Sequence, residues 1–188
     1  MLTLEQKNSN EIRFMELLTK LNIDLTEVTK LLDRVDYFNK PASAQYNGAY
    51  PGGLCEYALR FAHELGILCN AYFPGRYSEE DVIKVALFKD IYRATMYEQY
   101  QKSFKDDTGE WVNVLAFRTK DSVNREVFGD LALSSYFQIK NFISLTDEQS
   151  LAIIHSTGNF PPDIHDVMRT YPLVALTRMA EIATTHLY

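Results

Sequence analysis

Apolar residues recur at helical spacing through most of this chain, and this pattern restricts the fold more than any other sequence feature. The N-terminal series are Ile12, Met15, Leu18 and Leu21, then Val28, Leu31, Leu32 and Val35. Steps of three and four residues place such side chains on one face of a helix. We therefore expect two short helices within Glu11–Phe38, the second capped by Asp24 or Thr26 and ended before Pro41.

The same periodicity predicts further helices along the rest of the chain. One is expected from about Leu54 to Asn70, and another after Ser78, whose spacing to Asp81 is that of a capping box. Later helices are expected over 131–142, after a cap at Thr146, and from about Pro172 to the end of the chain. The fold class that follows is mostly α.

The stretch 97–117 has a different character. Aromatic and β-branched residues flank an Asp-Asp-Thr-Gly-Glu sequence at 106–110. Two β-prone runs separated by Asp and Gly favour a hairpin. We expect one small β-hairpin, at about 97–118, inserted into a helical bundle.

Length and charge set further bounds. At 188 residues and 46% hydrophobic composition, the chain fits one domain over 1–188, with 1–36 as an N-terminal helical extension. The formal charge is −6 and no basic cluster is present, so bulk nucleic-acid binding is not expected. The sequence shows neither the pattern of a secretory leader nor an apolar run long enough to span a membrane, so we expect a cytoplasmic protein.

Cys55 and Cys69 lie on one expected helix, about 21 Å apart along its axis, so free thiols are predicted. The 12 Tyr and 11 Phe residues fit a bulky core. They also fit an aromatic interface, which leaves a homo-oligomer open.

No catalytic motif is visible from spacing alone. The histidines at 63, 155, 165 and 186 lack the spacing of an HExxH pair, and no phosphate loop or nucleophile elbow occurs.

Several segments taken in order resemble a family of proteins. YNGAYPGGLCEYAL at 46–59 is similar to the YHxAYxGGLxEHSL stretch of HD-domain proteins, and ALFKDI at 86–91 falls at their LLHDI. After the hairpin come Gly-Asp at 129–130, AIIHSTG at 152–158 and LTRMAEIAT at 176–184, which resemble the family's Gly-His, AIRWHMG and HxADxLAT. The chain thus resembles small phage HD hydrolases and the HD domain of YhaM-type exoribonucleases, which implies an HD-like bundle and a phage or prophage origin.

The resemblance also implies where a metal site would lie. The family's divalent-metal ligands fall on Tyr57, Lys89, Asp90 and Glu181, of which only Asp90 is unchanged. Tyr is a poor ligand for common divalent ions, and an ammonium has no lone pair to offer. Lys89 beside Asp90 and Glu181 predicts a buried ion pair in the space of the metal; the alternative is that Lys89 and Asp90 lie on the surface.

Two further positions match family sites for a second metal or for phosphate. Asp130 and His155 form a possible residual site with Asp90 and Glu181, although His155 also fits a helix-terminal residue bonded to a carbonyl. Asn47, Gly52 and Gly53 are expected to shape the turn before the helix, through positive φ or close backbone approach.

These observations leave three functions open. The first is a catalytically inactive HD-like protein that binds a protein partner, with no cofactor expected and possible association with a virion. The second is a residual phosphohydrolase with Mg²⁺ or Mn²⁺ held by the oxygens and the imidazole. The third is a nucleotide-binding sensor or sponge in which Lys89 contacts phosphate.

Overall fold

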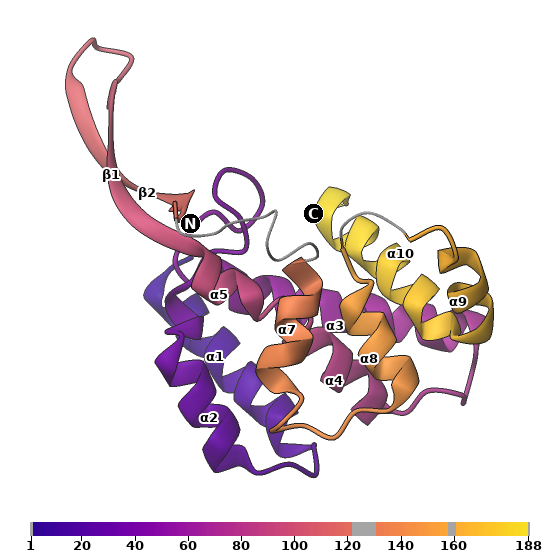
Figure 1. The fold of residues 1–188 in the computed structure, drawn as a ribbon. Coiled ribbons are helices and arrows are strands. Elements are labelled where there is room, and N and C mark those ends of the chain that lie inside the picture. Colours follow the sequence, from indigo (N-terminus) through magenta and orange to yellow (C-terminus); the bar gives the residue numbers. More distant parts are fainter. Residues whose placement is uncertain (1, 122–130, 158–160, 188) are drawn as a thin grey trace.

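The computed structural model describes residues 2–121, 131–157 and 161–187, and these parts of the chain are mostly helical (Figure 1). In chain order the elements are α1 (Leu4–Thr19), α2 (Leu25–Arg34), the 3-10 helix η1 (Tyr37–Asn39), α3 (Gly53–Tyr72), α4 (Glu79–Phe88), α5 (Tyr92–Met96), β1 (Tyr97–Lys105), β2 (Trp111–Thr119), α7 (Leu131–Ile139), α8 (Asp147–Ile154), α9 (Ile164–Thr170) and α10 (Pro172–His186). The predicted mostly α class with one small hairpin is confirmed.

The N-terminal helices differ from the prediction at their ends. α1 begins at Leu4 rather than Glu11, because Thr3 and Gln6 form a capping box ahead of the apolar series. Asp24 caps α2 through the Thr26 and Glu27 amides, so the alternative cap at Thr26 is wrong. α2 ends at Arg34, and a left-handed Asp36 (φ 53°) separates it from η1.

α3 is the central helix of the bundle. It packs against α1, α4 and α10, and Phe61 and Leu65 on its inner face are fully buried. α8 packs against α4, α7 and α10 and closes the other side. The largest fully buried side chains of this common core are Tyr37, Phe14, Phe61, Phe88, Lys89, Leu18 and Leu32. A lysine among aromatic and aliphatic core residues is the unusual member.

The capping predictions for the later helices are confirmed. Ser78 with Asp81 opens α4, and Thr146 with Gln149 opens α8. The Gln149 amide also donates to the Asp81 carboxylate at 2.7 Å, so the two caps join the starts of neighbouring helices. The helix expected over 131–142 ends at Ile139, and the short α5 and α9 have no clear periodic signal.

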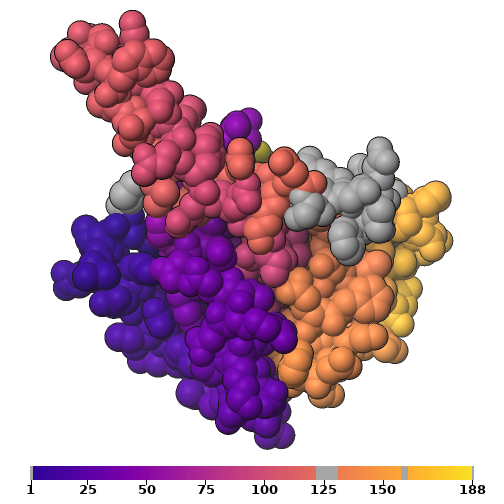
Figure 2. Space-filling model, turned by 60° about the vertical axis from the view of Figure 1, so that its left-hand side comes forward, coloured from indigo at the N-terminus to yellow at the C-terminus, as the bar shows by residue number. Residues whose placement is uncertain are grey.

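The hairpin arm, Tyr97–Thr119, is an antiparallel ribbon of β1 and β2 that continues directly from α5. It stands clear of the helical body in Figures 1 and 2. Only Phe117, near its base, is buried; Trp111 near the tip is 69% exposed. The arm is therefore attached to the core at one end only.

The helices and the two cysteines bear on earlier expectations. Among the described residues, none of the helices has the length and apolar character needed to cross a membrane. Cys55 and Cys69 both lie on α3 as buried free thiols, and burial raises their pKa values to about 12 and about 11.

Candidate functional site

The charge cluster, which we define as Lys89, Asp90, Arg93 and Glu181, lies inside the bundle. Lys89 follows the last residue of α4, and its side chain is fully buried. Its ammonium donates to Asp90 Oδ2 and, at 2.5 Å, to Glu181 Oε2. This is the arrangement that the ion-pair hypothesis predicts, and the alternative of two surface residues is wrong.

Arg93 completes the cluster from α5. Its Nε lies 2.8 Å from Asp90 Oδ1 and its guanidinium lies 3.3 Å from Glu181 Oε1. All four oxygens of the two carboxylates therefore face a cationic nitrogen. Two cations and two anions balance in formal charge, which is the condition under which charged groups are retained in a protein interior.

Aromatic rings cover the cations on the side of α3. The Lys89 nitrogen lies 4.3 Å from the centre of the Phe61 ring and 5.3 Å from that of Tyr57. The Arg93 guanidinium carbon lies 5.2 Å from the same Tyr57 ring. These distances are in the cation–π range. The Tyr57 hydroxyl shares a hydrogen bond of 3.0 Å with Thr185 on α10.

The electrostatics of the cluster favour the charged forms of Asp90 and Arg93. Burial by itself raises the pKa of Asp90, but the nearby Arg93 and Lys89 charges outweigh it and hold the pKa below its ordinary value of 3.8. Burial by itself lowers the pKa of Arg93, but the Asp90 and Glu181 charges outweigh that effect and hold the pKa well above its ordinary value. Burial raises the pKa of Tyr57 above its ordinary 10.0, so this phenol is neutral at pH 7.

These residues do not fit a divalent metal ion. A metal between Asp90 and Glu181 would have to displace the Lys89 ammonium, which cannot ligate and repels a cation. Tyr57 offers a neutral phenol already bonded to Thr185. Among the described residues, no group of three or more His, Cys, Asp or Glu side chains is placed to hold a metal.

The glycine turn that precedes α3 is tied to this site. Gly52 has a φ of 85°, and a Cβ on Gly53 would lie 2.1 Å from the Gly48 carbonyl oxygen. The Asn47 amide donates to the Thr185 carbonyl at 2.6 Å, which joins the turn to α10. Ala42, bonded through its amide to the Gly48 carbonyl, accepts a hydrogen bond of 2.7 Å from Arg93.

Of the other two positions suggested by the resemblance, His155 alone lies in the described part of the chain. Asp130 lies outside the described residues. His155 is the half-buried residue that ends α8, and its amide donates to the Leu151 carbonyl. Within the described residues, the hydrogen bonds of Asp90 and Glu181 run to Lys89 and Arg93 and not to His155.

Sequence reasoning missed three members of this site. Arg93 carries a signal in hindsight, because it lies three residues after Asp90, a spacing that brings side chains together on a helical turn. Phe61 lies one helical turn after Tyr57 on α3, so the same rule places both rings on one face. Thr185 has no comparable local signal, since its partners come from the turn and from α3.

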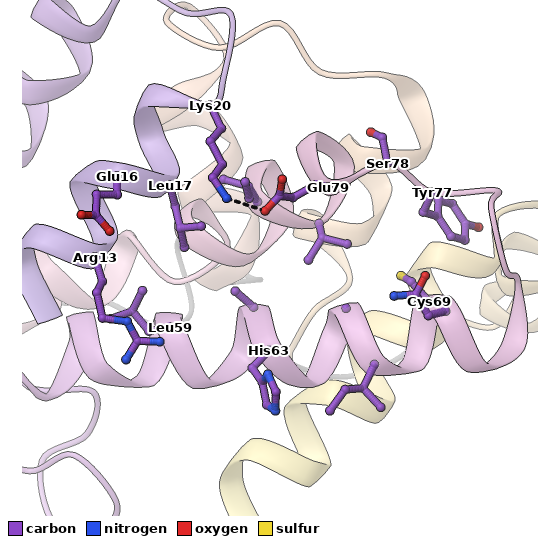
Figure 3. Close-up of a pocket in the computed structure, with 16 residues that line it drawn as sticks. Arg13, Glu16, Leu17, Lys20, Leu59, His63, Cys69, Tyr77, Ser78 and Glu79 are labelled. Carbon is purple, nitrogen blue, oxygen red and sulfur yellow. Dashed lines mark hydrogen bonds and ion pairs between the residues drawn. The ribbon is translucent and has the colours of Figure 1, made fainter.

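A separate cleft of about 680 Å³ lies between α1, α3 and α4 (Figure 3). Lys20 reaches Glu79 across it at 2.7 Å, and Arg13, Glu16 and His63 lie along its sides. None of the four residues of the charge cluster lines it. The cleft is open, mixed in charge and distinct from the buried cluster.

Comparison of the chain with family models, with known proteins and with solved structures finds no match.

Proposed function

We propose that this chain is an HD-like protein of phage or prophage origin that has lost metal-dependent hydrolysis and acts by binding a protein partner. One observation carries the proposal. The ammonium of Lys89 is fully buried between Asp90 and Glu181, two carboxylates at positions where the resemblance implies metal ligands. Together with Arg93, this internal cation supplies the two positive charges that a divalent metal would otherwise bring.

The cluster as a whole supports a structural role for these positions. Phe61 and Tyr57 cover Lys89, and the side chain of Asp90 is only 4% exposed, so the group offers little room for a substrate phosphate or an attacking water. Lys89 and Arg93 both direct their charge at internal carboxylates. These contacts weigh against the residual phosphohydrolase and against a nucleotide phosphate held by Lys89.

The test is the metal content of the purified chain, followed by a Mn²⁺ titration. We expect no stoichiometric metal in the native chain and only weak, non-specific Mn²⁺ binding, because metal entry requires expulsion of a buried ammonium. The double variant Lys89→His, Tyr57→His adds two imidazoles beside Asp90 and Glu181, and we expect it to gain Mn²⁺ affinity.

The matched control is Lys89→Met, which removes the ammonium and adds no ligand. A gain of Mn²⁺ affinity in this control would come from removal of the repelling ammonium alone, whereas a gain limited to the double variant would come from the imidazole ligands. About one equivalent of tightly held metal in the native chain, with hydrolysis of a phosphodiester substrate, would make the residual phosphohydrolase the better description. Nucleotide binding in a calorimetric titration, lost in a Lys89→Met variant that circular dichroism shows to be folded, would instead favour the nucleotide sensor.

A further inference from the structure

The outer edge of β2 has backbone groups without a strand partner in the described part of the chain. Two backbone hydrogen bonds flank the β1–β2 pairing. At the tip the Asp106 amide donates to the Glu110 carbonyl, and at the base the Lys120 amide donates to the Met96 carbonyl. With the observed register, the even-numbered residues of β2 bond to β1. The odd-numbered residues Trp111 to Thr119 therefore direct their amides and carbonyls outward, and the described sheet has two strands only.

The two edges of the arm differ in how they are protected. β1 carries three charged side chains, at Glu98, Lys102 and Lys105, and charges on an edge strand discourage pairing with another chain. β2 carries one, Arg118, and it is bonded to Glu98 of β1 at 2.8 Å. Neither Pro nor Gly interrupts the nine residues of β2. The β2 edge is the open one.

The arm also exposes apolar surface that a two-stranded ribbon cannot bury. Trp111, Val114 and Leu115 are 69%, 40% and 50% exposed, and Phe104 of β1 is 41% exposed. An isolated two-stranded hairpin is marginally stable in water, whereas additional strands give it a shared face. Trp111, Val114 and Leu115 lie on β2, the strand with the less protected edge.

We propose that β2 pairs with β2 of a second copy of this chain, antiparallel and about a two-fold axis at Leu115, to form a four-stranded sheet. Leu115 is the midpoint of Trp111–Thr119, so this register overlaps the whole strand. It is also an odd-numbered residue, so the outward-facing backbone groups of both copies meet each other.

Charge complementarity selects the second copy as the occupant. In this register Glu110, just before β2, lies opposite Lys120 of the second copy, just after β2, and the symmetry produces this pair twice. Arg118 lies opposite Val112 of the second copy, so no like charges face each other. Cross-strand pairs of opposite charge stabilise a sheet, and a generic extended peptide would not supply them at both ends.

The shape of the molecule permits this pairing. The arm projects from the body (Figures 1 and 2), and nine residues of strand span about 30 Å. Antiparallel pairing places the two helical bodies at opposite ends of the four-stranded sheet. The tip of each arm then lies beside the base of the other copy's arm. The pairing uses no residue of the charge cluster, so it stands or falls independently of the proposed function.

The experiment is sedimentation equilibrium on the full chain and on two proline variants. Asn113→Pro removes an outward amide from β2, and Ser103→Pro removes the equivalent outward amide from β1. The two residues are register partners and share one side-chain hydrogen bond, so both variants lose the same internal contact. We expect a wild-type dimer, a dissociation constant at least about tenfold higher for Asn113→Pro, and a dimer unchanged in Ser103→Pro.

Charge exchange tests the register without disturbing the backbone. Glu110→Lys and Lys120→Glu each place like charges opposite one another, and we expect each to weaken the dimer by about tenfold. The double variant restores opposite charges and is expected to restore the dimer. Trp111, the only tryptophan, reports the same equilibrium through its emission as protein concentration rises.

Three results would overturn the proposal. The first is a wild-type chain that stays monomeric up to about 1 mM. The second is a dimer that both proline variants weaken equally, which would place the contact elsewhere. The third is a charge-exchange double variant no better than either single one, which would reject this register.

Discussion

Lys89 shows how one side chain can change what a pair of carboxylates does. A divalent ion between Asp90 and Glu181 would be exchangeable and would leave coordination positions for water, whereas an ammonium is covalently attached and brings only donors. Arg93 then saturates the remaining oxygens. At this scale the site resembles a packed structural element rather than a reaction centre.

Loss of the ammonium is expected to destabilise the fold strongly. Lys89→Met leaves Asp90 and Glu181 with Arg93 as their one cationic partner among the described residues. Breaking a buried ion pair on one side costs about 3–5 kcal/mol. Urea unfolding measures the change. Lys20→Met, which breaks the exposed pair with Glu79, is the control and should leave the midpoint nearly unchanged. Equal midpoints for the two variants would mean that the buried pair contributes no net stability.

The start of α3 is the element on which the site depends most. Two successive glycines meet different demands: Gly52 adopts a left-handed φ, and Gly53 allows the Gly48 carbonyl to approach the helix backbone closely. The helix that begins there carries Tyr57 and Phe61 to the cations. The turn and the cluster are thus parts of one arrangement.

A methyl group at this helix start should be poorly tolerated. In Gly53→Ala the Cβ would lie 2.1 Å from the Gly48 oxygen, so the turn must move, at a cost of about 1–3 kcal/mol. Gly66→Ala lies in the same helix, where the nearest atom is Val82 Cγ1 at 4.0 Å, and should instead stabilise by about 0.5–1 kcal/mol. Thermal and urea unfolding of both variants measure the difference. Opposite signs are expected, and two stabilising substitutions would contradict the packing described for Gly53.

Elements are predictable from the sequence to different degrees. Ser78 and Thr146 are recognisable as helix starts because a capping box is complete within four residues. The same box at Thr3 is harder to recognise because the polar first turns of α1 carry little apolar periodicity. α5 and α9, of five and seven residues, are too short for a period of 3.6 residues to appear.

At the scale of the whole molecule, the arm and the body behave as separate parts. The helices share one core, whereas the arm beyond Tyr100 and Ala116 contributes no buried residue to it. Removal of the outer arm should therefore leave the body folded. Tyr100 and Ala116 are register partners and can be joined by a two-residue Asn-Gly turn.

We expect this shortened chain to keep the unfolding free energy of the monomeric wild-type chain to within about 0.5 kcal/mol, because none of the removed residues is buried. Chemical unfolding at concentrations below the dimer equilibrium measures it. The shortened chain should also remain monomeric at every concentration. A large loss of stability would mean that the arm folds back on the body in solution.

Features that depend on neighbours within a few residues can be predicted from the sequence: helical segments, several caps, the hairpin and the residue types at the charge cluster. Lys89 and Asp90 are adjacent, and the chemistry of an ammonium beside a carboxylate already argues against a simple metal site. Two features of the cluster come from tertiary packing instead: Glu181, 92 residues from Lys89, contacts the same ammonium, and Arg93 contacts both carboxylates. Tertiary packing also leaves the arm apart from the body, and among the described residues no third strand covers its β2 edge. Such contacts arise from the packing of α3, α4 and α10 around a common core, and spacing along the chain carries no information on how distant helices pack.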